Sequence, residues 1–135
     1  MHATIHGERT LTDLDFARLS KLLPGRALLP AHLADLLASA EVMSSRAVPC
    51  NVVTMNSRAE LVDVHTGRRQ TLTVCFPKDA EPAAGFISVL SPVGSSLLGL
   101  RVGDIARWHT PNGADCAAEV ATVLFQPEAA GDYQK

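Results

Sequence analysis

The sequence predicts an α+β fold in which a short antiparallel helical hairpin precedes an antiparallel sheet around one short helix. Three observations predict it. Apolar residues recur every three to four positions up to about residue 42, as on the buried face of a helix. This periodicity is lost between Ser44 and Pro49, and β-branched residues with period two follow, as in strands. We therefore expect two units, residues 1–48 and residues 49–135.

The first helix of the hairpin is expected over Leu11–Leu23. Thr12 has a side chain suited to an N-cap, and Asp13 and Asp15 lie in the first turn, where the helix dipole favours negative charge. Pro24-Gly25 should end the helix, because proline cannot continue the hydrogen-bond ladder and glycine tolerates a left-handed exit.

The second helix is expected from Pro30 to about Val42. Pro30 is acceptable in a first turn, and the predicted helix carries one apolar stripe, made of Leu33, Leu36, Leu37 and Ala40. Each helix of roughly ten residues would span only about 15 Å. Because so short a hairpin is marginal alone, its leucines are expected to pack on each other or to form a homodimer.

The strands of the second unit are expected from β-branched runs separated by turn residues. Ser91 and Pro92 should begin the short helix as N-cap and first helical residue, and Gly99 should end it. The aromatic residues are expected to be core: Phe76, Phe86, Trp108 and Phe125. The predicted strands are Val52–Met55, Arg58–Val64, Gln70–Phe76, Phe86–Leu90, one containing Ile105 and Trp108, and Cys116–Phe125.

Composition favours a protein partner. The chain has 12 Lys and Arg against 14 Asp and Glu, so it lacks the basic surplus that strong direct nucleic-acid binding requires. Three widely spaced cysteines and five histidines without ligand spacing predict reduced thiols, with no metal and no cofactor. The sequence contains neither a secretory signal nor a membrane span, which predicts a cytoplasmic protein.

Four segments carry a resemblance to a known family. The run Ser91–Asp104 resembles the Ser-Pro, Leu-Leu-Gly and Val-Gly-Asp elements in the carboxyl half of the Gre factors. With Val53–Arg58, Phe76–Asp79 and Gln126–Tyr133, the chain looks like the Rnk group, the regulators of nucleoside diphosphate kinase. The resemblance implies an FKBP-like fold for residues 49–135, binding to RNA polymerase and a regulatory, non-enzymatic effect on transcription.

The resemblance also defines what the hairpin lacks. Gre factors stimulate transcript cleavage with acidic side chains at the tip of a long coiled coil, where these help to hold a catalytic magnesium ion. Between Asp15 and Asp35 this sequence has Lys21, Arg26 and His32 but no Asp or Glu. We therefore expect no transcript cleavage.

By the same resemblance, Ser91, Pro92 and Val93 are the expected partner-binding residues, docking at the rim of the polymerase secondary channel. The alternative is that Ser91 and Pro92 only start a helix whose leucines are core. A second alternative is an FKBP-type prolyl isomerase or chaperone. A hydrolytic triad of Ser91, Asp104 and His109 is not expected, because no nucleophile elbow surrounds the serine.

Overall fold

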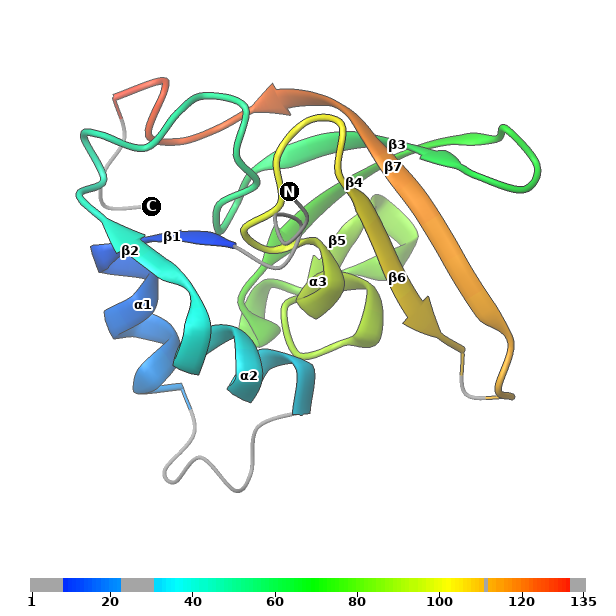
Figure 1. The fold of residues 1–135 in the computed structure, drawn as a ribbon, viewed down its shortest axis with the longest axis horizontal. Helices are drawn as coiled ribbons and strands as arrows, with labels where there is room; N and C mark the ends of the chain where they lie inside the picture. Colours follow the sequence, from blue (N-terminus) through cyan, green and yellow to red (C-terminus); the bar gives the residue numbers. More distant parts are fainter. Residues whose placement is uncertain (1–8, 23–30, 111, 132–135) are drawn as a thin grey trace.

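The computed structural model describes residues 9–22, 31–110 and 112–131 of the 135-residue chain (Figure 1). Among the described residues up to 48, called the N-terminal unit below, there are two short helices and two short strands. The described residues from 49 onward, called the sheet domain below, contain the longer strands, which form a curled sheet beside one further α-helix, so the fold is mixed α+β. The elements in order are β1 Thr10–Thr12, α1 Asp13–Ser20, α2 Ala31–Ser39, β2 Glu41–Met43, β3 Arg58–Asp63, β4 Arg69–Cys75, η3 Pro77–Asp79, η4 Pro82–Ala84, β5 Phe86–Ser88, α3 Pro92–Leu97, β6 Ile105–His109 and β7 Asp115–Phe125.

The main sheet has five strands in the order β5-β4-β3-β7-β6. The β4–β3, β3–β7 and β7–β6 pairs are antiparallel, as predicted. The β4–β5 pair is parallel, with Thr73 opposite Phe86, so the prediction of a wholly antiparallel sheet is wrong here. The physical reason is the connection: η3 and η4 carry the chain back along β4, so that β5 enters in the same direction.

The N-terminal unit differs in detail from the predicted hairpin. Thr12 is the N-cap of α1, as expected, because its Oγ1 accepts a hydrogen bond from the Asp15 amide at 3.0 Å. However, α1 ends at Ser20, and Val42 lies in β2 rather than in a helix. Strands β1 and β2 pair in parallel, with α1 and α2 between them in the chain (Figure 1). The predicted stop at Pro24-Gly25 lies outside the described residues.

The predicted strand Val52–Met55 is wrong. It forms only one isolated bridge, between Val52 and Arg101. Val53 still exchanges backbone hydrogen bonds, since its amide donates to the Leu100 carbonyl and its carbonyl accepts from the Gly99 amide. The next two amides bond to side chains instead: the Thr54 amide donates to Ser57 Oγ and the Met55 amide donates to Asp15 Oδ2. The segment therefore ends in a turn at Met55, which is held by a side chain of α1.

One apolar core joins the two parts of the chain. Leu19 and Leu33 of the N-terminal unit belong to the same buried cluster as Leu61 and Leu97 of the sheet domain. The division into residues 1–48 and 49–135 therefore stays a prediction, because both parts contribute to a shared core.

The aromatic residues are less buried than predicted. Phe76 and Trp108 are partly buried and pack against the core, but Phe86 is 40% exposed and Phe125 is 37% exposed. The core prediction is thus wrong for these two. Phe86 begins the edge strand β5 and Phe125 ends β7, positions that strand periodicity alone does not mark as open.

Within the described ranges, no helix is long and apolar enough to cross a membrane.

Candidate functional site

The loop that leads into α3 is held by its own hydrogen bonds. Ser91 is the N-cap, as predicted, because its Oγ accepts from the Gly94 amide at 3.1 Å. The same hydroxyl donates to the Ser88 carbonyl at 2.7 Å, and the Leu90 amide donates to Ser88 Oγ at 3.0 Å. The hydroxyl of Ser91 is therefore engaged in shaping the loop.

The other two predicted contact residues differ in exposure. Pro92 is exposed, whereas Val93 is half-buried and packs against the core. Leu97 and Leu98 are completely buried, so the expectation that the leucines of this helix are core is confirmed. Pro92 is thus the one of the three predicted residues whose side chain is largely accessible to a partner.

Gly94 fixes where α3 sits. A Cβ at this position would lie 2.1 Å from the carbonyl oxygen of Ser88, well inside van der Waals contact. Only glycine allows α3 to approach the end of β5 so closely. The Ser-Pro-x-Gly run therefore sets the position of the loop as well as the start of the helix.

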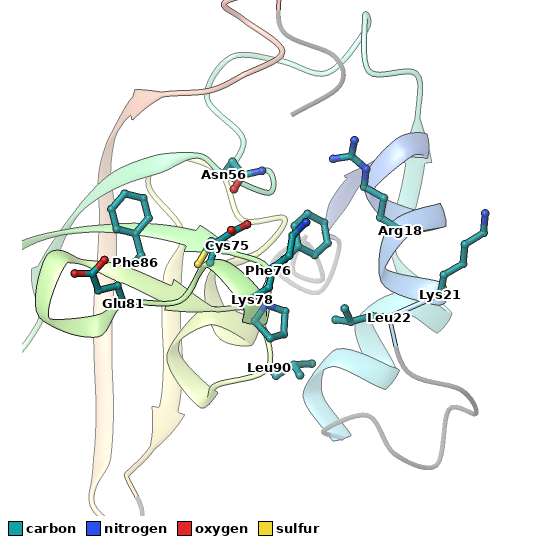
Figure 2. Close-up of a pocket in the computed structure, with 12 residues that line it drawn as sticks. Arg18, Lys21, Leu22, Asn56, Cys75, Phe76, Lys78, Glu81, Phe86 and Leu90 are labelled. Carbon is teal, nitrogen blue, oxygen red and sulfur yellow. The ribbon is translucent and has the colours of Figure 1, made fainter.

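An open groove adjoins this loop (Figure 2). Its volume is about 1150 Å³, and its walls come from the end of α1 on one side and from the segment between β4 and α3 on the other (Figures 1 and 2). Leu90 lines the groove and directly precedes Ser91, so groove and loop are continuous. The lining residues are Arg18, Lys21, Leu22, Asn56, Cys75, Phe76, Pro77, Lys78, Asp79, Glu81, Phe86 and Leu90.

Charge is distributed unevenly along the groove. Figure 2 shows Arg18 and Lys21 together at the α1 end, and Glu81 beside Phe86 at the other end. The Arg18 guanidinium lies over the Phe76 ring, 5.9 Å from its centroid, a cation–π geometry. The groove therefore has a cationic end and an acidic end, and between them lie apolar side chains together with Lys78.

Beneath α1 lies a buried polar junction, formed by Asp15, Thr54, Ser57 and Glu128. Asp15 is 2% exposed, and its Oδ2 accepts a hydrogen bond from the Met55 amide at 3.0 Å. Glu128 is 9% exposed, and its Oε1 accepts from the Thr54 hydroxyl at 2.6 Å. The junction ties α1, the turn at Met55 and the C-terminal segment to one another.

Burial raises the pKa of Asp15 to about 7. Loss of hydration disfavours the carboxylate, and the negative charge of nearby Glu128 disfavours it further. The hydrogen bond from the Met55 amide and the hydrogen bond with the Thr12 side chain both lower the pKa, but their effect is smaller than that of desolvation. Asp15 is therefore close to half-protonated at neutral pH.

Ser91, Asp104 and His109, the residues of the hydrolytic triad that was not expected, make separate contacts. Asp104 accepts a hydrogen bond from the Arg101 amide, and His109 Nδ1 lies 2.6 Å from Asp115 Oδ1 on an exposed strand end. Ser91 is part of neither contact, so no triad forms. Cys50, Cys75 and Cys116 are all free thiols.

No cluster of metal-ligating side chains occurs in the described part of the chain. Of the three basic residues singled out between Asp15 and Asp35, Lys21 is exposed and lines the groove. Arg26 and the side chain of His32 lie outside what the structure describes.

Comparison with known proteins assigns the chain to a family. The model of the C-terminal region of the transcription elongation factors GreA and GreB matches residues 48–125. The chain belongs to the GreA/GreB family. It is 39% identical over 127 residues to the regulator of nucleoside diphosphate kinase of Escherichia coli strain K12, covering 91% of this chain and 93% of that protein.

Its similarity to GreA itself covers less. GreA of Desulfotalea psychrophila is 38% identical over 81 residues, which are 60% of this chain and 50% of GreA. Among solved structures, a GreA/GreB elongation factor from Nitrosomonas europaea superposes with a TM-score of 0.73 at 35% identity, over 87% of this chain and 98% of that one. The chain therefore shares the overall fold of a short GreA/GreB family member.

The two walls of the groove differ in whether they lie within the GreA/GreB match. Phe76, Lys78 and Leu90 lie inside the matched range, whereas Lys21 and Leu22, which directly follow α1, precede it. Phe76–Asp79 is recognisable in the sequence as a family segment, but its contact with the end of α1 is not. No periodicity reveals such a contact, because it depends on how the N-terminal unit packs on the sheet domain.

The buried carboxyl of Asp15 was also missed, although a signal existed. Asp15 is four residues before Leu19, so both lie on one helix face, and Leu19 is fully buried. The sequence predicted Asp15 only as a residue of the first helical turn, where the dipole favours negative charge. The burial of Glu128, in the segment after the GreA/GreB match, has no comparable sequence signal.

Proposed function

We propose that this chain is an RNA polymerase-binding regulator of transcription that does not stimulate transcript cleavage. The observation that carries the proposal is the extent of the similarity. The chain matches a regulator of nucleoside diphosphate kinase over nearly the full length of both proteins, but matches only half of a GreA elongation factor.

The lack of cleavage follows from residue chemistry in the N-terminal unit. Helices α1 and α2 have eight and nine residues, so each spans only about 12 to 14 Å. No Asp or Glu occurs between Asp15 and Asp35, and Asp15 is buried in the junction. Carboxylates that could hold a magnesium ion at a remote active centre are thus missing from the connection between the helices.

We propose that attachment uses the loop of Ser91, Pro92 and Val93, at the rim of the polymerase secondary channel. Pro92 supplies the exposed contact. Ser91 holds the loop through Ser88 and Gly94, and Val93 anchors it to the core. The sheet that supports this loop is, in our proposal, FKBP-like, and the site of action is the cytoplasm, where the polymerase works.

The test is a binding assay between the purified chain and core RNA polymerase, competed by a Gre factor. We expect saturable binding that the Gre factor displaces. Pro92→Ala combined with Val93→Glu should weaken binding, with the fold checked by thermal unfolding because Val93 is partly buried. Pro92→Ala alone, at an exposed position, provides the variant with no packing change.

Two alternatives have less support. The matched relatives bear the names of regulators and transcription factors, so nothing favours a prolyl isomerase, and we propose no catalytic activity. A homodimer through the hairpin leucines is weakened by their burial, since Leu33, Leu36 and Leu37 are at most 5% exposed within one chain. Mass measurement in solution decides the oligomeric state.

A further inference from the structure

The groove beside α1 is built from two parts of the chain. Lys21 and Leu22 form the α1 wall, and Phe76 and Leu90 lie on the opposite wall. Only the second wall falls within residues 48–125, the range matched by the GreA/GreB family. A partner that occupies the groove therefore contacts the N-terminal unit and the sheet domain together.

The size and lining of the groove suit a polypeptide segment. Its volume of about 1150 Å³ is larger than the roughly 300 to 1000 Å³ of a typical small-molecule pocket. Leu22, Phe76 and Leu90 are only partly buried by the core, and Phe86 is 40% exposed. Grooves with such apolar surface accept the apolar side chains of a partner segment.

The charges at the two ends would orient that segment. Arg18 and Lys21 make the α1 end cationic, while Glu81 lies at the β5 end with Phe86 (Figure 2). Lys78 lies between them in the figure, and Asp79 also lines the groove. Since charge complementarity selects partner and register more than affinity, carboxylates on the segment should face α1.

We propose that the groove receives a polypeptide segment of the polymerase, with apolar side chains at its centre and carboxylates at the end that faces Arg18 and Lys21. In this arrangement Lys21 is a specificity-determining residue, and α1 is a fixed wall of the docking surface. The inference rests on the proposed function, because Leu90 joins the groove directly to the docking loop at Ser91.

A nucleic-acid strand is the other class of occupant with negative charge. The lining holds three cations against the two carboxylates of Asp79 and Glu81, and the whole chain has a formal charge of −2. Backbone binding by nucleic acid needs several unopposed cations along a strand. The observations therefore favour a protein segment.

The experiment compares two charge reversals for binding to core RNA polymerase free of nucleic acid. Lys21→Glu changes the α1 wall. Arg68→Glu is the matched control, since Arg68 is exposed and lies in the β3–β4 turn, which extends away from α1 in Figure 1. Lys21→Gln removes the charge without reversing it, and thermal unfolding confirms that each variant is folded.

We expect Lys21→Glu to weaken binding by about three- to tenfold at low salt, the range expected for a rim charge. Lys21→Gln should fall between it and the unmodified chain, and the differences should shrink as salt rises. Arg68→Glu should stay within about twofold.

Equal affinities for Lys21→Glu and the unmodified chain would overturn the inference, and so would equal losses for Lys21→Glu and Arg68→Glu. A loss with Lys21→Glu that appears only when nucleic acid is added would assign the groove to nucleic acid instead. If Pro92→Ala with Val93→Glu weakens binding while Lys21→Glu does not, the docking loop stands and the groove proposal fails. No binding of the unmodified chain removes both proposals.

Discussion

The buried face of α1 and its C-terminal end meet very different surroundings. The buried face carries Asp15 and Leu19 into the protein, where they are 2% and 0% exposed. At the C-terminal end, Arg18 and the C-cap residue Lys21 line the open groove. The same short segment thus fastens the N-terminal unit to the sheet domain and supplies one wall of a surface. The difference shows that the N-terminal unit is packed against the domain rather than held apart from it.

The buried face should dominate stability. Leu19→Ala removes a fully buried side chain of the shared core, and we expect it to lower the free energy of unfolding by about 2 to 5 kcal/mol. Leu22→Ala, at the partly exposed groove side of the same helix end, should lower it by less than about 1.5 kcal/mol. Urea unfolding of the two variants measures the contrast. Similar losses would mean that the two positions are equally buried.

The junction should make stability depend on pH. Because the pKa of Asp15 is about 7 in the folded protein, against a usual value of 3.8, folding favours the protonated acid. The stabilisation of the fold by this protonated carboxyl is complete below about pH 4 and is lost as the pH rises towards 7. The loss lowers the free energy of unfolding by roughly 2 to 4 kcal/mol. Unfolding free energies measured between pH 4 and 8 should therefore decrease with pH.

Asp15→Asn isolates this effect. The amide keeps an oxygen that can accept from the Met55 amide, but it does not titrate, so the decrease between pH 4 and 7 should become much smaller. An exposed carboxylate, as in Asp79→Asn, serves as the control and should leave the pH dependence unchanged. A parallel pH profile for Asp15→Asn and the unmodified chain would show that Asp15 ionises normally.

The loop at the edge of the groove should contribute least to stability. Ser91→Ala removes the cap that accepts from the Gly94 amide, which we expect to cost about 1 kcal/mol. Ser91→Asn, which retains a capping oxygen, should be within a few tenths of a kcal/mol of the unmodified chain. Differential scanning calorimetry resolves the two. Equal melting temperatures for both variants would indicate that the cap is not important to the loop.

Local sequence signals correctly predicted the elements that depend mainly on residues close together in the sequence. The caps at Thr12 and Ser91, the hairpin of β3 and β4, and the long strand β7 follow from hydroxyl caps, a Thr-Gly turn and β-branched runs. Each is specified by residues that are neighbours in sequence.

Tertiary contacts decided the elements that were predicted wrongly. Strands β1 and β2 have three residues each and exist because they pair with one another. The turn at Met55 replaces a predicted strand because Asp15, 40 positions earlier in the chain, accepts its amide hydrogen. The candidate site divides in the same way. The cap of the docking loop was predictable from its own residues, but the groove was not, since Lys21 and Lys78 come together in its lining from distant parts of the sequence.

The most direct test of the central proposal is a transcript-cleavage assay on stalled elongation complexes, with and without a Gre factor. We predict that the chain alone produces no cleavage above background, and that increasing amounts of it suppress Gre-stimulated cleavage by competing for the docking site. The Pro92→Ala, Val93→Glu variant should suppress less. Cleavage stimulated by the chain alone, or Gre-dependent cleavage unaffected by a large excess of it, would contradict the proposed function.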